Sequence, residues 1–135
     1  MNNSWIYSIG TLKVFNKWTL LECDDNIGGL YRSLYSLEYF YKPKIQKPLW
    51  GSHISIIRGE TLLDQTIAEK INDMRVGFVY YPIMQTTGVH FFLPCYSLVF
   101  DTVRDLFGLD KTPVNYHLSI GNIVNHVGKT TPETF

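Results

Sequence analysis

Two short motifs, His-Ile-Ser at residues 53–55 and His-Leu-Ser at residues 117–119, place a histidine two positions before a serine. Both lie in stretches with the residue types of a β-strand, in which alternate side chains point to opposite faces. Each histidine therefore shares a face with its serine, while the apolar residue between them points into the core. Each predicted strand thus presents an imidazole and a hydroxyl together on its polar face.

Two such strands facing each other would gather two imidazoles and two hydroxyls around one small space. This set suits cleavage of a phosphodiester without a metal ion, because a neutral histidine takes a proton from the nucleophile while a protonated histidine donates one to the leaving oxygen. The serine hydroxyls would hydrogen-bond the non-bridging oxygens of the phosphate. The two motifs are equivalent in composition, so the sequence does not distinguish base from acid. The residues expected to be catalytic are His53, Ser55, His117 and Ser119.

The elements that must hold these motifs are predicted from hydrophobic spacing and from turn residues. Apolar residues recur at helical spacing after the capping residues Asp24 and Asp25, and again between Tyr96 and Phe107. Residues 59–73 fit either a short helix or a loop. Two helices among mainly antiparallel strands predict an α+β domain. The predicted strands are residues 10–15, 17–23, 52–58, 76–81, 89–93 and 115–120.

Length, composition and charge limit the function classes. A chain of 135 residues with 45% hydrophobic residues predicts a single domain, residues 1–135, with a packed core. Lys and Arg number 12 and Asp and Glu number 12, so we do not expect binding to a long nucleic acid, which needs an excess of basic residues. Neither a signal peptide nor an apolar run long enough to cross a membrane is visible, and no obligate protein partner is evident.

The two cysteines indicate the compartment. Cys23 and Cys95 lie in apolar surroundings without the spacing of a metal site. We therefore expect reduced thiols in the core of a cytoplasmic protein, with no metal site and no cofactor.

The surroundings of the two motifs resemble a known family. The stretch PLWGSHISIIRGE around the first motif, and the run GVHFFLPCYSLVFDTVRDLFGLDKTPVNYHLSIG that ends in the second, are similar to the paired H-x-[ST] regions of the 2H phosphoesterase superfamily. Both motifs carry serine where threonine is commoner in that family, and the hydroxyl is retained. The resemblance implies a two-lobed, RNA-ligase-like fold, in which antiparallel sheets line a central cleft and helices lie outside.

Within that superfamily, the small size and the opening GTLKVFNKWTLLE resemble the phage anti-CBASS phosphodiesterases. This resemblance implies a phage counter-defence enzyme that hydrolyses cyclic di- and trinucleotide messengers of bacterial antiviral immunity to linear products in the host cytoplasm, with His53 and His117 as the catalytic pair. Two alternatives stay open. One is a 2H-type enzyme acting on RNA ends that carry a 2′,3′-cyclic phosphate, and the other is a protein that sequesters a nucleotide without cleaving it.

One cation and four aromatic rings are expected to contact such a nucleotide. A lysine in the first predicted strand, flanked by apolar residues, is expected to place its ammonium on the polar face, where it could meet a second phosphate. Rings beside the predicted strands could stack on the bases. The expected ligand contacts are Lys13, Trp50, Tyr80, Tyr81 and Tyr116.

Two further residues near the motifs have predictions that depend on strand parity. Arg58 falls on the opposite parity to His53, so unless the strand is bulged we expect it to pair with Glu60 or Asp64 and to be structural. Gly121 has the same parity as the second motif, where the lack of a side chain would leave room for the substrate.

Overall fold

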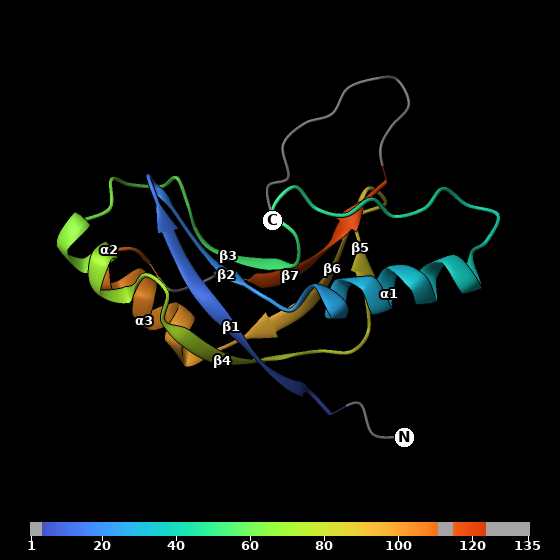
Figure 1. Cartoon of the computed structure of the whole chain (residues 1–135), viewed down its shortest axis with the longest axis horizontal. Coiled ribbons are helices and arrows are strands. Elements are labelled where there is room, and N and C mark those ends of the chain that lie inside the picture. The colour runs from blue at the N-terminus through green and yellow to red at the C-terminus, as the bar shows by residue number, and fades with distance from the viewer. Residues whose placement is uncertain (1–3, 111–114, 124–135) are drawn as a thin grey trace.

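Seven strands and three helices make up the part of the chain that this computed structural model describes, residues 4–110 and 115–123 (Figure 1). The strands are β1 (Ile6–Phe15), β2 (Trp18–Glu22), β3 (His53–Arg58), β4 (Arg75–Tyr80), β5 (Gln85–Thr86), β6 (His90–Tyr96) and β7 (Tyr116–Asn122). The helices are α1 (Asp25–Glu38), α2 (Gln65–Ile71) and α3 (Leu98–Leu106).

The strands form one antiparallel sheet in the order β4–β1–β2–β3–β7–β6–β5. β4 also pairs with β6, through Val79 with Tyr96 and Tyr80 with Cys95, so that six strands close into a barrel. The pairings differ in extent: β1 and β4 are in register over six positions, whereas the described part of β3 meets β7 at a single pair. The ring of strands is therefore continuous, but the number of residue pairs in register differs between neighbouring strands.

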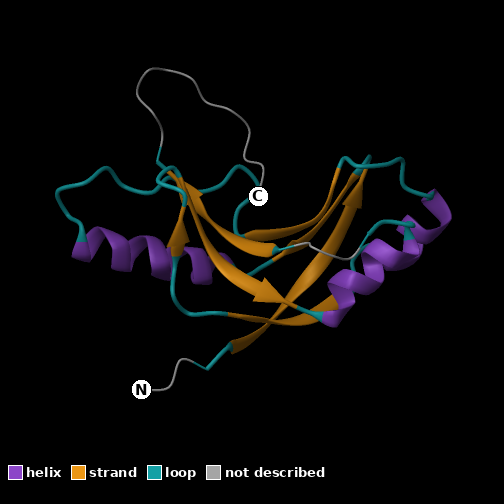
Figure 2. Cartoon of the chain, turned by 180° about the vertical axis from the view of Figure 1, so that it is seen from behind, coloured by secondary structure: helices purple, strands orange, loops and turns teal. Residues whose placement is uncertain are grey.

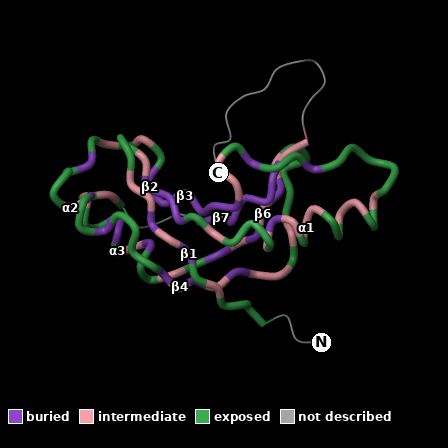
Figure 3. Tube along the Cα trace, in the orientation of Figure 1, coloured by how far each residue is buried: buried purple, intermediate pink, exposed green. Residues whose placement is uncertain are grey.

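One face of the sheet, which we call the core face, carries an apolar row across five strands. Each residue of the row faces the next, and all are almost fully buried. Helices pack at the two sides of the strands, with α1 on one side and α2 and α3 on the other, as Figure 2 shows. Figure 3 shows that the buried residues follow the central strands, whereas much of the helices is exposed. The row consists of Leu12, Leu21, Ile54, Leu118 and Leu93.

The expected fold, an α+β domain with two lobes and a central cleft, is wrong. The structure is mostly one sheet that closes into a barrel, and the two motif strands are neighbours in that sheet. The physical reason lies in the residues between each histidine and serine. Ile54 and Leu118 pair with each other across β3 and β7, so the motifs share one apolar row and lie side by side in the sheet.

The stretch whose sequence fits either a helix or a loop contains helix α2. Its N-cap is Asp64, whose carboxylate accepts hydrogen bonds from the backbone N–H groups of Thr66 at 2.8 Å and Ile67 at 3.2 Å. The buried Ala68 and Ile71 anchor the helix. Among the described helices, none has the length and apolar character needed to span a membrane.

Gly121 makes room for the protein's own chain. Its φ is +150°, and a Cβ atom there would overlap the carbonyl oxygen of Gln46. Gln46 and Asn122 exchange two backbone hydrogen bonds, of 2.6 and 3.1 Å, which attach the segment after α1 to β7. The expectation that Gly121 leaves space for a substrate is therefore wrong, because residue 46 already occupies that space.

Replacement of Gly121 by alanine is expected to lower the free energy of unfolding by about 3 kcal/mol, since the new methyl group meets backbone and the backbone angle is strained. Gly108 provides a matched control: its φ is +72°, but a Cβ atom there meets nothing within 4 Å. Gly108→Ala should cost about 1 kcal/mol, from backbone strain alone. Urea unfolding of both variants measures the difference, and equal losses would contradict the close approach of Gln46.

Candidate functional site

The two motifs meet on the face of the sheet opposite the core face, which we call the site face. The pairing of Ile54 with Leu118 turns the residues on either side of each toward this opposite face. Because the two strands run antiparallel, His53 and Ser119 lie on one side of this pair along the strands, and Ser55 and His117 lie on the other. Two imidazoles and two hydroxyls therefore gather over neighbouring strands.

His53 has a fixed orientation. Its Nδ1 lies 2.8 Å from the carbonyl oxygen of Gly51, which only accepts, so Nδ1 carries the proton and donates it. Gly51 has a φ of +69°, and the following backbone N–H, of Ser52, donates to Oδ1 of Asp25 at 2.9 Å. That hydrogen bond also lowers the pKa of Asp25. The start of α1 thus anchors the turn that orients the His53 ring.

His53 is fully buried, and Trp50 lies against it. The two ring centroids are 5.6 Å apart, with the rings edge to face. The same indole contacts Phe15 at 5.8 Å and Trp18 at 5.4 Å, so it belongs to an aromatic cluster over β1 and β2. A ligand therefore reaches the His53 imidazole after a neighbouring group moves.

His117 is half-buried beside Phe92, with ring centroids 4.2 Å apart. Burial lowers the pKa of His117, and the nearby guanidinium of Arg58 lowers it further. Both causes disfavour the imidazolium, so the neutral form is favoured at neutral pH. The environment of His117 thus favours the neutral imidazole, which is the form that can accept a proton.

Ser55 and Ser119 are both buried. The Oγ atom of Ser55 has no hydrogen-bond partner in the described structure, although it lines a hollow next to His117. A buried hydroxyl without a partner is costly, and a ligand oxygen would satisfy it. The hollow, which we call the Arg58 hollow, has a volume of about 330 Å³ and is lined by Ser55, Ile56, Arg58, Glu60, Arg104, Asn115 and His117.

A β-bulge in β3 brings Arg58 to this hollow. On β2, Thr19 pairs with Ile57 but the next residue, Leu20, pairs with Ser55, which leaves Ile56 as an extra residue. The extra residue reverses the alternation, so Arg58, paired with Trp18, returns to the site face. The expectation that Arg58 is structural applied to an unbulged strand, and the bulge means that this condition is not met.

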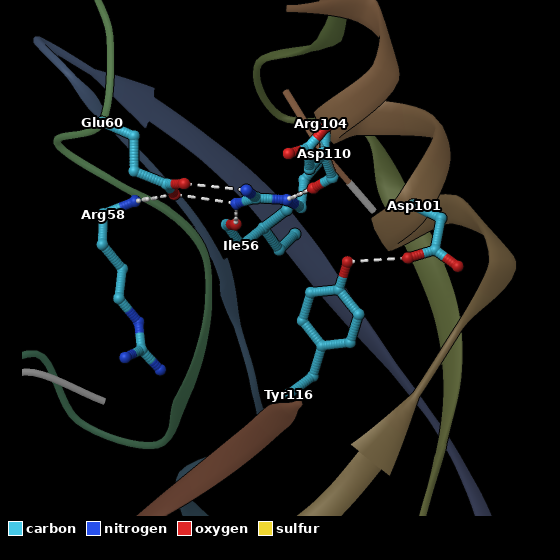
Figure 4. A network of polar contacts seen from close by, with 7 residues as sticks. All are labelled: Ile56, Arg58, Glu60, Asp101, Arg104, Asp110 and Tyr116. Atoms are coloured by element: carbon cyan, nitrogen blue, oxygen red, sulfur yellow. Dashed lines mark hydrogen bonds and ion pairs between the residues drawn. The ribbon is translucent and has the colours of Figure 1, made fainter. Parts of the chain in front are cut away.

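Arg104 of α3 holds the bulge (Figure 4). Its Nη1 donates to the carbonyl oxygen of Ile56 at 2.8 Å, and its two Nη atoms reach the two carboxylate oxygens of Glu60 at 2.7 Å each. The backbone N–H of Arg58 also donates to Glu60, at 3.2 Å. The Arg104 guanidinium is the main cause of the lowered pKa of Glu60. Sequence spacing could not indicate this role of Arg104, because Ile56 and Glu60 lie 48 and 44 residues away.

The five expected ligand contacts fall into two groups. Tyr80 and Tyr116 are buried in the core, and the Tyr116 hydroxyl donates to Asp101 at 2.8 Å, although Tyr116 also borders the hollow over β6 and β7. Lys13 is on the site face and its ammonium pairs with Asp73. The pKa of Lys13 is raised, chiefly by its hydrogen bond with this carboxylate.

Of the remaining two rings, Trp50 borders a hollow, and Tyr81 packs against a ring that borders another. The β1–β2 hollow, about 290 Å³, lies between Trp50 and residues that include Lys13 and Phe15. The β6–β7 hollow, about 430 Å³, is lined by Trp5, Phe92 and His117 among others. Tyr81 lies behind Trp5, with ring centroids 5.4 Å apart. Aromatic walls thus flank the paired motifs on both sides.

Comparison of the chain with protein-family models, with curated proteins and with solved structures finds no match. In the described ranges, no three or more His, Cys, Asp or Glu side chains are grouped so that they could hold a metal ion.

Replacement of Arg58 by glutamine is expected to raise the pKa of His117 toward the ordinary histidine value of about 6.5, because one of the two causes of its lowering is removed. Arg75→Gln, at the start of β4, removes the same charge outside the Arg58 hollow and should leave that pKa unchanged. An NMR titration of the histidine rings, with His117 assigned from a His117→Gln variant, makes the measurement. An identical midpoint in Arg58→Gln and the wild type would contradict the placement of Arg58.

Proposed function

We propose that the protein is a metal-independent phosphodiesterase whose catalytic groups are His53, Ser55, His117 and Ser119. The observation that carries this proposal is the pairing of Ile54 with Leu118, which sets both His-x-Ser motifs side by side on one face. Two histidines with opposite proton roles are what general acid–base cleavage requires. The proposal keeps the chemistry implied by the 2H phosphoesterase resemblance and not its fold.

The local environments favour one assignment of proton roles. His117, whose pKa is lowered, takes the proton from a ribose 2′-hydroxyl, and the 2′-oxygen attacks the neighbouring phosphorus. The bond from phosphorus to the 5′-oxygen breaks, and His53, through Nε2, donates a proton to that oxygen. Ser55 and Ser119 hydrogen-bond the non-bridging oxygens, where negative charge must be held.

A second step completes hydrolysis with the roles exchanged. His53, now neutral, takes a proton from water, which attacks the 2′,3′-cyclic phosphate formed in the first step. The bond to the 2′-oxygen breaks, and His117 returns its proton to that oxygen. The product is a linear oligonucleotide with a terminal phosphate.

The substrate class we infer is a cyclic di- or trinucleotide. Two hollows with aromatic walls flank the motifs, one over β1 and β2 and one over β6 and β7, which suits a phosphate with a nucleoside on either side. The equal numbers of acidic and basic residues favour a small ligand over a long polynucleotide. With the sequence resemblance, this supports a phage counter-defence role against cyclic-nucleotide signalling in the bacterial cytoplasm.

A second candidate is a protein that sequesters the same nucleotide without cleaving it. The full burial of His53 favours this reading, since a general acid must reach the leaving oxygen. Binding in the flanking hollows alone would need no access to His53.

Purified protein incubated with 3′,3′-cyclic GMP-AMP in the presence of EDTA is expected to release a linear product, detected by chromatography. His53→Gln and His117→Gln should each lower turnover about 10²-fold or more, because each removes one proton-transfer group. His90→Gln is the matched control, since it changes a histidine of β6 outside the paired motifs.

Near-wild-type turnover in either motif variant would contradict the paired-histidine mechanism. Tight binding without cleavage would favour the sequestering protein. If the protein neither cleaves nor binds the cyclic dinucleotide, the substrate to test next is RNA with a 2′,3′-cyclic phosphate end.

A further inference from the structure

The Arg58 hollow carries an excess of positive charge. Two guanidinium groups, of Arg58 and Arg104, and one carboxylate, of Glu60, line it. The Arg104 group is committed within the protein: besides Glu60 and Ile56, it bonds the carbonyl oxygen of Asp110 through Nε at 2.6 Å. Glu60 is held by the same pair of hydrogen bonds, so its charge is largely balanced.

Arg58 is placed differently from Arg104. Its backbone N–H donates to Glu60, and its side chain runs away from the Glu60–Arg104 pair, as Figure 4 shows. The register sets that side chain on the site face, and the hollow that it lines is the one lined by Ser55 and His117. A guanidinium, a buried hydroxyl and an imidazole thus border one space.

These three groups are complementary to a phosphate. The guanidinium offers paired N–H donors, and the Ser55 hydroxyl, buried without a partner, gains one from an anionic oxygen. The positive excess of the hollow attracts the anion, and the anion in turn offsets the repulsion between Arg58 and a protonated His117.

We propose that Arg58 is the cationic ligand of the phosphate group in this site, and that Arg104 and Glu60 are its positioning residues because they hold the β3 bulge. The identity of the bound group as a phosphodiester rests on the proposed function. Binding of the anion itself does not, since it needs no turnover.

The positioning role follows from the bulge. The extra residue, Ile56, interrupts the hydrogen-bond ladder with β2, and its carbonyl oxygen is satisfied by Arg104. Glu60 fixes Arg104 through two parallel hydrogen bonds and also accepts from the backbone of Arg58. A weaker Glu60–Arg104 pair would let the strand relax and turn Arg58 from the hollow.

The first test is titration of the protein with inorganic phosphate, followed through the NMR signals of the His117 ring. We expect saturable binding by the wild type that Arg58→Gln weakens about tenfold or more, in keeping with the loss of a charge-assisted pair. Arg75→Gln, with the same loss of charge elsewhere, should bind as the wild type does. Absent binding in the wild type, or equal affinity in Arg58→Gln, would overturn the proposal.

The second test separates positioning from plain electrostatics with Glu60→Gln. Removing a negative charge from the hollow should by itself strengthen phosphate binding and lower the pKa of His117. Displacement of Arg58 has the opposite effects, so we expect weaker phosphate binding and a raised pKa of His117 at temperatures where the variant is folded. Tighter phosphate binding, or unchanged values accompanied by a lower melting temperature, would overturn the positioning role.

Both tests measure phosphate binding and therefore do not depend on turnover. Phosphate binding that depends on Arg58, with no cleavage of a cyclic dinucleotide, would leave this inference standing and reject the proposed enzyme activity. Cleavage that depends on both motif histidines but not on Arg58 would do the reverse.

Discussion

The hydrogen bond from the Arg104 guanidinium to the carbonyl oxygen of Ile56 determines the shape of the candidate site. A bulged residue loses its place in the strand ladder, and a buried carbonyl without a donor costs about 1–3 kcal/mol. A buried guanidinium is itself unfavourable unless an acid balances it, and Glu60 does so with two hydrogen bonds. One ion pair between α3 and the end of β3 therefore stabilises both an irregular backbone and the side chains that it displays.

The apolar row of the core face fixes which side chains lie on the site face. Because side chains alternate with a period of two, a slip of one residue between neighbouring strands would bring leucines to the surface and histidines into the core. Burial of the row from Leu12 to Leu93 opposes any such slip. Packing of the core therefore also fixes the face of the sheet on which the two motifs lie. Both motifs are parts of strands, so no separate loop has to be ordered to place them.

Sequence alternation was sufficient to predict which groups share a face, but not which strands are neighbours. The shared face of His53 and Ser55 follows from spacing alone, and the same parity rule applied to β4 would have assigned Tyr80 to the core with Val76 and Phe78. The two-lobed fold failed because strand order depends on pairing between distant segments. The face on which Arg58 lies could not be decided from the sequence, because the bulge is held by Arg104, 48 residues beyond Ile56.

The uneven joining of the barrel has a consequence for motion. β3 and β7 are in register at one pair in the described structure, whereas β1 and β4 share six, so the site lies over a seam that is less extensively paired than that between β1 and β4. Amide protons along this seam should exchange with solvent through local opening well before those of β1 and β4. The same opening would change the separation of the two imidazoles, because His53 and His117 lie on opposite sides of this seam.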